Sequence, residues 1–114
     1  MKTLNIAVLA GSLFLAMAAI NPAQAAVNEV QAKQLLTANK CTKCHSPTKT
    51  KSGPSWKKIA AKHKGKADAE KKIIDNMTKG PMVELDDGTK EEHKIIKTKD
   101  PKALKNLAQW ILAH

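Results

Sequence analysis

The chain has 114 residues, with 20 basic residues that are all lysines and 10 acidic residues, for a formal net charge of +10. Such a charge would suit nucleic-acid binding, but proteins that read phosphates and base edges depend on the bidentate fork of arginine, which this chain lacks. Composition therefore argues against a nucleic-acid partner. The positive charge instead favours binding to proteins with acidic docking patches, or to an anionic membrane surface.

Residues 1–25 have the pattern of a secretory signal peptide. Lys2 precedes an apolar run over residues 6–20, and a small-residue triplet follows at 23–25. An uncleaved membrane anchor is the alternative, but this run is shorter than the roughly 20 residues of a spanning helix. We therefore expect cleavage after the triplet, export to the periplasm, and a mature domain at 26–114 with no stable membrane insertion.

The mature chain of 89 residues is one small domain. It lies near the size at which a core made of protein alone becomes marginal. Its only aromatic side chains are Trp56 and Trp110. Because its side chains provide so little large, flat apolar surface, a bound planar cofactor would supply that surface and complete the core.

Periodic apolar residues predict an all-α domain of three to four helices. The first helix is expected over residues 28–40, with Asn28 as its N-cap and Val30 on its apolar stripe. The second is expected over residues 67–79 and stops at Gly80. The first of these helices ends directly at a pair of cysteines.

The last helix has the clearest start signal, because Asp100 is a predicted N-cap followed by a proline at the first helical position. Apolar residues then recur with helical spacing to the C-terminus. Two smaller elements are expected before it. One is a short helical turn after Pro54, and the other is a hairpin-like excursion within 82–98, where Asp87-Gly88 predicts a turn.

The segment Cys41-Thr42-Lys43-Cys44-His45 has the attachment pattern of c-type haem. In this pattern two thiols add to the two haem vinyl groups, and the adjacent imidazole reaches the iron. The two intervening residues let the sulfurs meet neighbouring edges of the ring. The sequence therefore predicts one covalently attached haem c, held by Cys41, Cys44 and His45.

Three other uses of this cysteine pair remain open. A zinc site would need two more ligands at short spacing, and His63, His93 and His114 form no such pair. A dithiol redox motif would sit in an α/β fold, whereas these segments are predicted to be helical. A structural disulfide across so short a loop would constrain the unfolded chain little.

At these residues the mature chain resembles the small bacterial class I cytochromes c. The resemblance rests on an N-terminal helix that runs into the haem motif, on Gly-Pro-Ser-Trp at 53–56, and on Leu-Ala-Gln-Trp at 107–110 in the last helix. It implies an all-α fold wrapped around one haem. It also implies that the carbonyl of Pro54 accepts a hydrogen bond from His45, which would orient the ring and raise its basicity.

The second axial ligand departs from the family pattern. Family members usually place a methionine at a set distance before the tryptophan of the last helix, but this register holds His93, 17 residues before Trp110. We therefore favour His93 as the distal ligand opposite His45, with Met82 as the alternative. A thioether raises the haem potential and a second imidazole lowers it. Three further candidates are expected to be ordinary core or solvated residues: Met77, His63 and His114.

With both axial positions filled, the predicted task is one-electron transfer between redox proteins. We expect no enzymatic activity, since no pairing of a nucleophile with a base is evident. The alternative is a haem-based ligand or redox sensor in which His93 detaches. Lysines near the motif would steer docking onto acidic patches, or would serve only as a solubilising surface. These are Lys43, Lys49, Lys51, Lys57 and Lys58.

Overall fold

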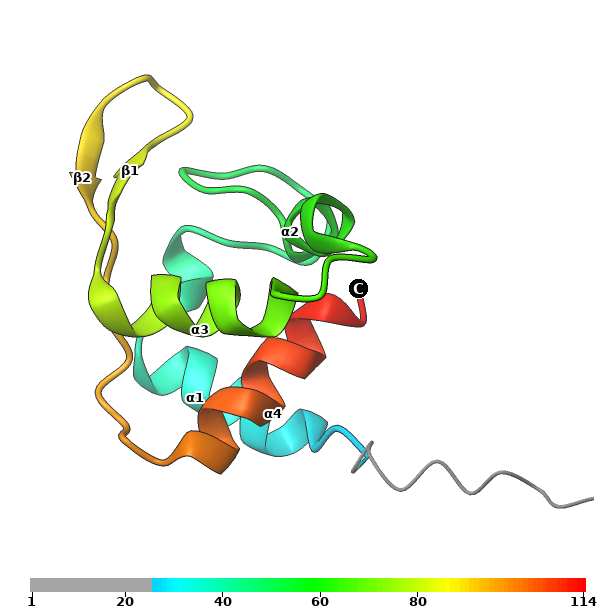
Figure 1. Cartoon of the computed structure of the whole chain (residues 1–114). Coiled ribbons are helices and arrows are strands. Elements are labelled where there is room, and N and C mark those ends of the chain that lie inside the picture. Colours follow the sequence, from blue (N-terminus) through cyan, green and yellow to red (C-terminus); the bar gives the residue numbers. More distant parts are fainter. Residues whose placement is uncertain (1–25) are drawn as a thin grey trace, which may run out of the picture.

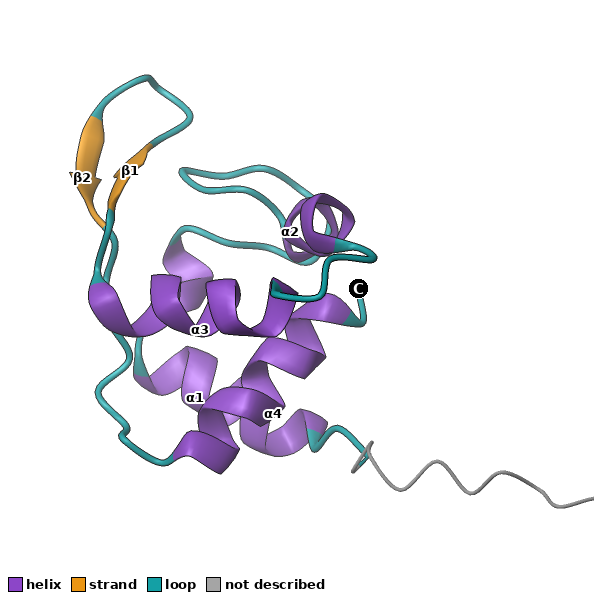
Figure 2. Cartoon of the chain, in the orientation of Figure 1, coloured by secondary structure: helices purple, strands orange, loops and turns teal. Residues whose placement is uncertain are grey.

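The structure is a computed structural model that describes residues 26–114. The predicted signal peptide lies outside the described residues. In chain order the elements are α1 (Glu29–Ala38), the 3₁₀ turn η1 (Cys41–Lys43), α2 (Trp56–His63), α3 (Ala69–Lys79), β1 (Met82–Glu84), β2 (Lys90–Glu92) and α4 (Pro101–Leu112). The expected all-α architecture is confirmed, with the two short strands as its only sheet within the described part of the chain (Figure 2).

The first and last helices pack against each other, as Figure 1 shows. The backbone N–H of Asn28 donates to Oδ1 of Asn106 at 2.7 Å, and Nδ2 of Asn106 donates to the Asn28 carbonyl at 2.8 Å. Asn28 also caps α1, because its Oδ1 accepts from the Gln31 N–H at 3.0 Å. One side chain of α4 thus fixes the start of α1, which positions the cysteines at its far end.

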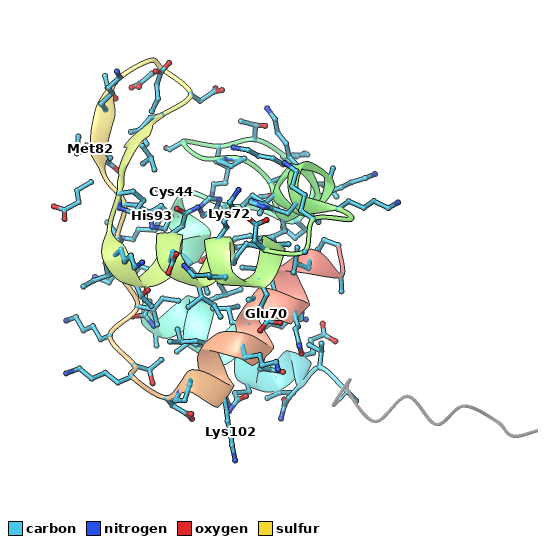
Figure 3. All side chains as sticks on the ribbon, in the orientation of Figure 1. Cys44, Glu70, Lys72, Met82, His93 and Lys102 are labelled. Carbon is cyan, nitrogen blue, oxygen red and sulfur yellow. The ribbon has the colours of Figure 1, made fainter. Side chains whose placement is uncertain are left out.

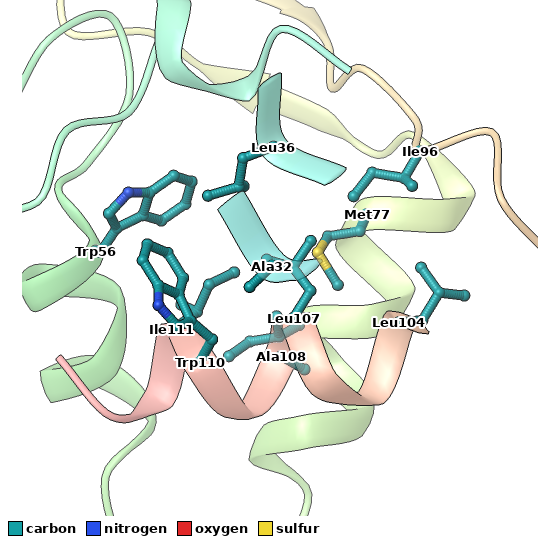
Figure 4. Close-up of a cluster of buried hydrophobic side chains, with 11 residues drawn as sticks. Ala32, Leu36, Trp56, Met77, Ile96, Leu104, Leu107, Ala108, Trp110 and Ile111 are labelled. Carbon is teal, nitrogen blue, oxygen red and sulfur yellow. The ribbon is translucent and has the colours of Figure 1, made fainter. Parts of the chain in front are cut away.

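The core lies where α4 meets the other helices (Figure 4). Ala32, Leu107 and Ala108 have no exposed surface, and the small alanines let α1 and α4 approach closely. Trp56 meets Trp110 edge to face, with ring centroids 6.0 Å apart. The two tryptophans thus join α2 to α4 in one apolar cluster, as edge-to-face aromatic pairs do.

The periodicity placed one residue of α1 on the wrong face. Val30 was expected on the apolar stripe but is 67% exposed, while Ala32 and Leu36 are buried. The helix also ends two residues earlier than predicted, since Asn39 is its C-cap and Lys40 turns into the left-handed region at φ 57°. Alanine carries so little apolar surface that its burial is hard to see in a sequence pattern.

The turn predicted after Pro54 is a helix of two turns, α2. Oγ of Ser55 accepts from the Lys58 N–H at 3.1 Å and so caps its start. Trp56, Ala60 and His63 share the buried face. This spacing of four and three residues is helical, and it makes His63 part of the interior.

The excursion before the last helix is a β-hairpin that stands away from the helical body in Figure 1. Its strands pair Met82 with Glu92 and Glu84 with Lys90, around a turn in which Gly88 has φ 83°. At its base the His93 N–H donates to the Pro81 carbonyl at 2.8 Å. The hairpin therefore returns the chain close to where it left α3.

No helix within residues 26–114 has the length and apolar character that crossing a bilayer requires.

Candidate haem site

A cavity of about 370 Å³ lies between η1, α2, α3 and the hairpin. Its wall includes Cys41, Cys44, His45, Pro54 and His93. The sequence motif and the proposed distal ligand therefore face one space, although 48 residues separate His45 from His93 in the chain. Apolar side chains of the core and hairpin complete the wall: Leu36, Trp56, Ile59, Ile73, Met77, Val83, Leu85, Ile96 and Ile111.

The two thiols are placed by the turn at the end of α1. After the left-handed Lys40, the N–H groups of Cys44 and His45 both donate to the Cys41 carbonyl, at 3.3 and 3.1 Å. This turn brings the cysteines and the imidazole to the same wall. The two cysteines form no disulfide with each other, and burial raises the pKa of the Cys41 thiol. A dithiol redox site would need a lowered thiol pKa, so the structure argues against that use.

His45 is held by a backbone acceptor. Its Nδ1 lies 2.6 Å from the Pro54 carbonyl, which can only accept, so Nδ1 carries the proton and Nε2 is left as a free lone pair. The ring stacks on Trp56 with centroids 4.6 Å apart and planes 25° apart. Burial lowers the pKa of His45. The imidazole is therefore neutral at pH 7, the form that binds a metal.

Gly53 leaves room for this ring. A Cβ at that position would lie 2.9 Å from Cε1 and 3.3 Å from Nδ1 of His45. The segment is tied down beside the motif, because the Gly53 N–H donates to the Cys44 carbonyl at 2.9 Å. The Gly53-Pro54 pair thus serves the imidazole twice, by supplying an acceptor and by having no side chain in the way.

The ring of His93 faces that of His45 at a centroid distance of 6.1 Å, with the planes 46° apart. Two imidazoles on opposite sides of one metal, with metal–nitrogen bonds of about 2 Å as histidine makes to zinc, have centroids roughly 6 Å apart. The observed spacing is compatible with a metal held between the two rings. The Nδ1 of His93 is buried and has no hydrogen-bond partner.

Met82 lies elsewhere. It is 66% exposed on the first strand and does not line the cavity, whereas His93 and Cys44 do, and Figure 3 shows Met82 on the hairpin. Met82 is therefore not part of the core. Met77 is 7% exposed and belongs to the core cluster, as predicted, although it also touches the cavity.

Sequence reasoning missed His63. It was expected to be solvated because lysines flank it, but it is only 8% exposed and lines the cavity. Its Nδ1 is buried without a partner. The signal that could have found it is the spacing from Trp56 through Ala60, which puts all three on one helical face.

The donor set fits haem better than a protein-only metal site. Over residues 26–114 no group of three or more histidine, cysteine, aspartate or glutamate side chains could hold a metal ion, which argues against the zinc alternative. Two thiols, two facing imidazoles and an apolar wall instead match a flat group with an iron at its centre.

Comparisons with known proteins agree with this geometry. A family model described as cytochrome c matches residues 30–114. A cytochrome c2 of Rubrivivax gelatinosus is 40% identical over 49 residues, 43% of this chain and 58% of that protein, so the chain spans a little over half the length of this curated relative.

Two solved structures are similar over most of the chain. The class 1 cytochrome MtoD of Sideroxydans lithotrophicus ES-1 is 50% identical, with a TM-score of 0.74, covering 77% of this chain and 97% of that one. The cytochrome c552 of Nitrosomonas europaea is 28% identical, with a TM-score of 0.55, covering 70% of this chain and 95% of that one.

Proposed function

Since the chain belongs to the cytochrome c family and carries one covalent haem c, we propose that it is a periplasmic one-electron carrier between redox proteins. Cys41, Cys44 and His45 fit the attachment motif of that haem. The iron of a bound haem supplies a one-electron ferric–ferrous couple. We assign attachment to the two cysteines, proximal ligation to His45, and its orientation to the Pro54 carbonyl.

The observation that supports this function most directly is the 6.1 Å separation of the His45 and His93 rings. His45 and His93 would together hold the iron and would leave no position for a substrate. His93 is thus the distal ligand that we propose, and Met82 remains the alternative to test. No catalytic group is proposed, so accepting and releasing an electron is the remaining task.

The identity of the distal ligand is tested by optical and near-infrared magnetic circular dichroism spectra of the ferric protein. We compare the wild type with His93→Ala and Met82→Ala. We expect a bis-imidazole signature that is lost only with His93, because Met82 is exposed on the hairpin. A sulfur-to-iron band that disappears only with Met82 would refute the assignment and indicate a higher-potential carrier.

Docking is proposed to depend on the lysines around the motif. Lys43, Lys49 and Lys51 lie on the exposed segment that follows α1, and Lys57 and Lys58 are exposed on α2. Some lysines of the first and third helices pair with carboxylates, but within residues 26–114 none of these five forms an ion pair. We expect electron transfer to a natural partner to slow as ionic strength rises. A rate that does not change with salt would argue for a solubilising surface instead.

Export is proposed from residues 1–25, which we assign as a cleaved signal peptide. Mass spectrometry of the haem-loaded protein from a periplasmic fraction should give a chain that begins at Ala26. A protein of full length in the membrane fraction would favour an uncleaved anchor.

A second candidate function is ligand sensing. Histidines that bind metals usually donate their other ring N–H to an acceptor, but Nδ1 of His93 has none, unlike Nδ1 of His45. A distal ligand without such support is easier to detach. Carbon monoxide added to the reduced protein separates the two functions, since rapid binding would favour the sensor and slow or absent binding the carrier.

A further inference from the structure

The β-hairpin carries a charge opposite to that of the rest of the domain. Residues 82–92 contain five of the ten acidic residues and one lysine, for a net charge of −4. The other 18 lysines and five acidic residues of the range 26–114 give a net charge of +13. A strongly positive protein thus presents one negative element. The hairpin acids are Glu84, Asp86, Asp87, Glu91 and Glu92.

The hairpin carboxylates are not neutralised by lysines of their own domain. All five acidic residues are exposed. Carboxylates near the helices form ion pairs with lysines, but within residues 26–114 none of the five hairpin carboxylates does. Lys51 and Asp86 line one hollow beside the hairpin tip, yet Nζ of Lys51 donates to the Thr42 carbonyl at 2.7 Å. The hairpin acids can therefore pair with lysines of another molecule.

Charges of both signs meet at the mouth of the haem cavity. Glu84 and Glu91 line the cavity and are exposed, so they lie at its mouth on the hairpin side. Lys62 also lines the cavity and is exposed, and the exposed Lys57 and Lys58 precede it on α2. Figure 1 shows the hairpin and α2 on opposite sides of the helical body. The mouth is thus acidic where the hairpin borders it and basic elsewhere. Its other exposed charged residues are Lys40 and Lys94.

The tip of the hairpin is fixed beside the haem motif. The Asp86 N–H donates to the Ser52 carbonyl at 3.0 Å, in the segment between η1 and α2. That segment is bound to the motif in turn, because the Gly53 N–H donates to the Cys44 carbonyl at 2.9 Å. The acidic side chains therefore start from a set position relative to the cavity, which lowers the entropic cost of docking.

We propose that the cavity mouth docks transiently onto the cavity mouth of a second copy of this chain, so that an electron passes directly between the two copies. A two-fold axis through the contact exchanges the two sides of the mouth, and it places the hairpin acids of each copy against the α2 lysines of the other. One copy is oxidised and the other reduced, with no change in bonds or protons. This inference rests on the proposed electron-carrier function.

A second copy suits this surface because the chain itself supplies both charges. A partner whose acidic patch covered the whole mouth would be repelled by the hairpin. Two copies with a positive net charge also repel each other, but salt limits the range of that repulsion. At physiological salt, exposed charges more than about 8 Å apart are largely screened, so the pairs formed at the contact decide the interaction.

The test is the rate of electron self-exchange between the ferric and ferrous haem-loaded protein, measured by nuclear magnetic resonance exchange spectroscopy. We compare the wild type with the double variant Glu84→Gln/Glu91→Gln. The matched control is Glu29→Gln/Asp68→Asn, which makes the same change in net charge. Both control residues are exposed, pair with lysines near the starts of α1 and α3, and do not line the cavity.

We expect the hairpin variant to exchange electrons about tenfold more slowly than the control. An exposed ion pair changes a binding constant by about twofold, and the two-fold contact contains each of the two substituted carboxylates twice. The difference should vanish at about 1 M salt, where the screening length is about 3 Å. Equal self-exchange rates in the two variants at low salt would overturn the proposal. If that variant were also slower with a natural redox partner, the hairpin would belong to that partner instead.

A second measurement is independent of electron transfer. A carbodiimide joins carboxylates to lysines that are in contact, and mixing isotope-labelled with unlabelled copies distinguishes links between copies from links within one. We expect links between copies that join Glu84 or Glu91 to Lys57, Lys58 or Lys62. Links only within one copy, or links spread evenly over the other lysines, would overturn the docking and leave the carrier function intact. A protein without covalent haem would instead refute the proposed function, whatever the links show.

Discussion

Replacing Gly53 by alanine tests how tightly the fold holds the proximal imidazole. The new Cβ would lie 2.9 Å from Cε1 of His45. Carbon atoms in contact prefer about 3.5–4.0 Å, so the ring or the Gly53 backbone must move by about 0.6 Å or more. A ring movement of that size would stretch the 2.6 Å contact between Nδ1 and the Pro54 carbonyl to the limit of a hydrogen bond.

The expected cost has two parts. Overpacking of a well-packed site destabilises by about 1–3 kcal/mol, and weakening the His45–Pro54 hydrogen bond adds up to about 1 kcal/mol. Guanidinium unfolding of the haem-loaded protein, followed by tryptophan fluorescence, measures the sum. Because the imidazole loses its acceptor, the haem spectrum and midpoint potential should change as well.

Gly65→Ala is the matched control, because it makes the same substitution without the clash. Gly65 has φ +74°, and a Cβ there would meet nothing within 4 Å. Left-handed backbone costs a residue with a Cβ about 1–2 kcal/mol, so this variant should lose stability but keep the wild-type spectrum and potential. An unchanged spectrum and stability in Gly53→Ala, or equal spectral changes in both variants, would refute the reasoning.

Three further substitutions test the framework around the site by denaturant unfolding. Leu107→Ala should cost about 2–5 kcal/mol, because this side chain has no exposed surface, and a loss below about 1 kcal/mol would contradict its central place in the core. Asp100→Ala removes the Oδ1 that accepts from the Lys102 N–H at 2.9 Å, so α4 should lose about 1 kcal/mol of capping, whereas Asp100→Asn should lose little. Hydrogen bonds from Lys71 and Lys79 lower the pKa of Asp75, so its stabilisation is present above the unfolded value of about 3.9 and is lost as pH falls through the lower folded value. Asp75→Asn should therefore be less stable to denaturant than the wild type at pH 7 in low salt. This difference in stability should vanish in high salt or strong acid.

Local patterns in the sequence were sufficient for the haem motif and most of the helices. The cysteine spacing, the Asp100-Pro101 start signal and the Asn28 cap each depend on residues within one turn of chain. These features act through short-range geometry, which a linear pattern contains in full. For the same reason the Asp87-Gly88 turn of the hairpin was predicted where the structure has it.

Burial depended on the tertiary structure. The flanking lysines of His63 indicated solvent, yet the packing of α2 sends this one side chain inward while Lys62 and Lys64 remain exposed. For Val30 the error was the opposite one. It was predicted to be on the apolar stripe but is exposed, because α4 covers the face of α1 that carries Ala32.

The sequence by itself determined which group this protein binds and where it attaches, because covalent attachment needs a fixed local spacing of thiols and imidazole. Only the tertiary structure decided which distant side chains surround that group. The hairpin brings the ring centroid of His93 to 6.1 Å from that of His45 and leaves Met82 exposed to solvent. In the sequence both His93 and Met82 were candidates for the distal ligand. Such pairings depend on how separate elements pack, and no pattern within a single element contains that information.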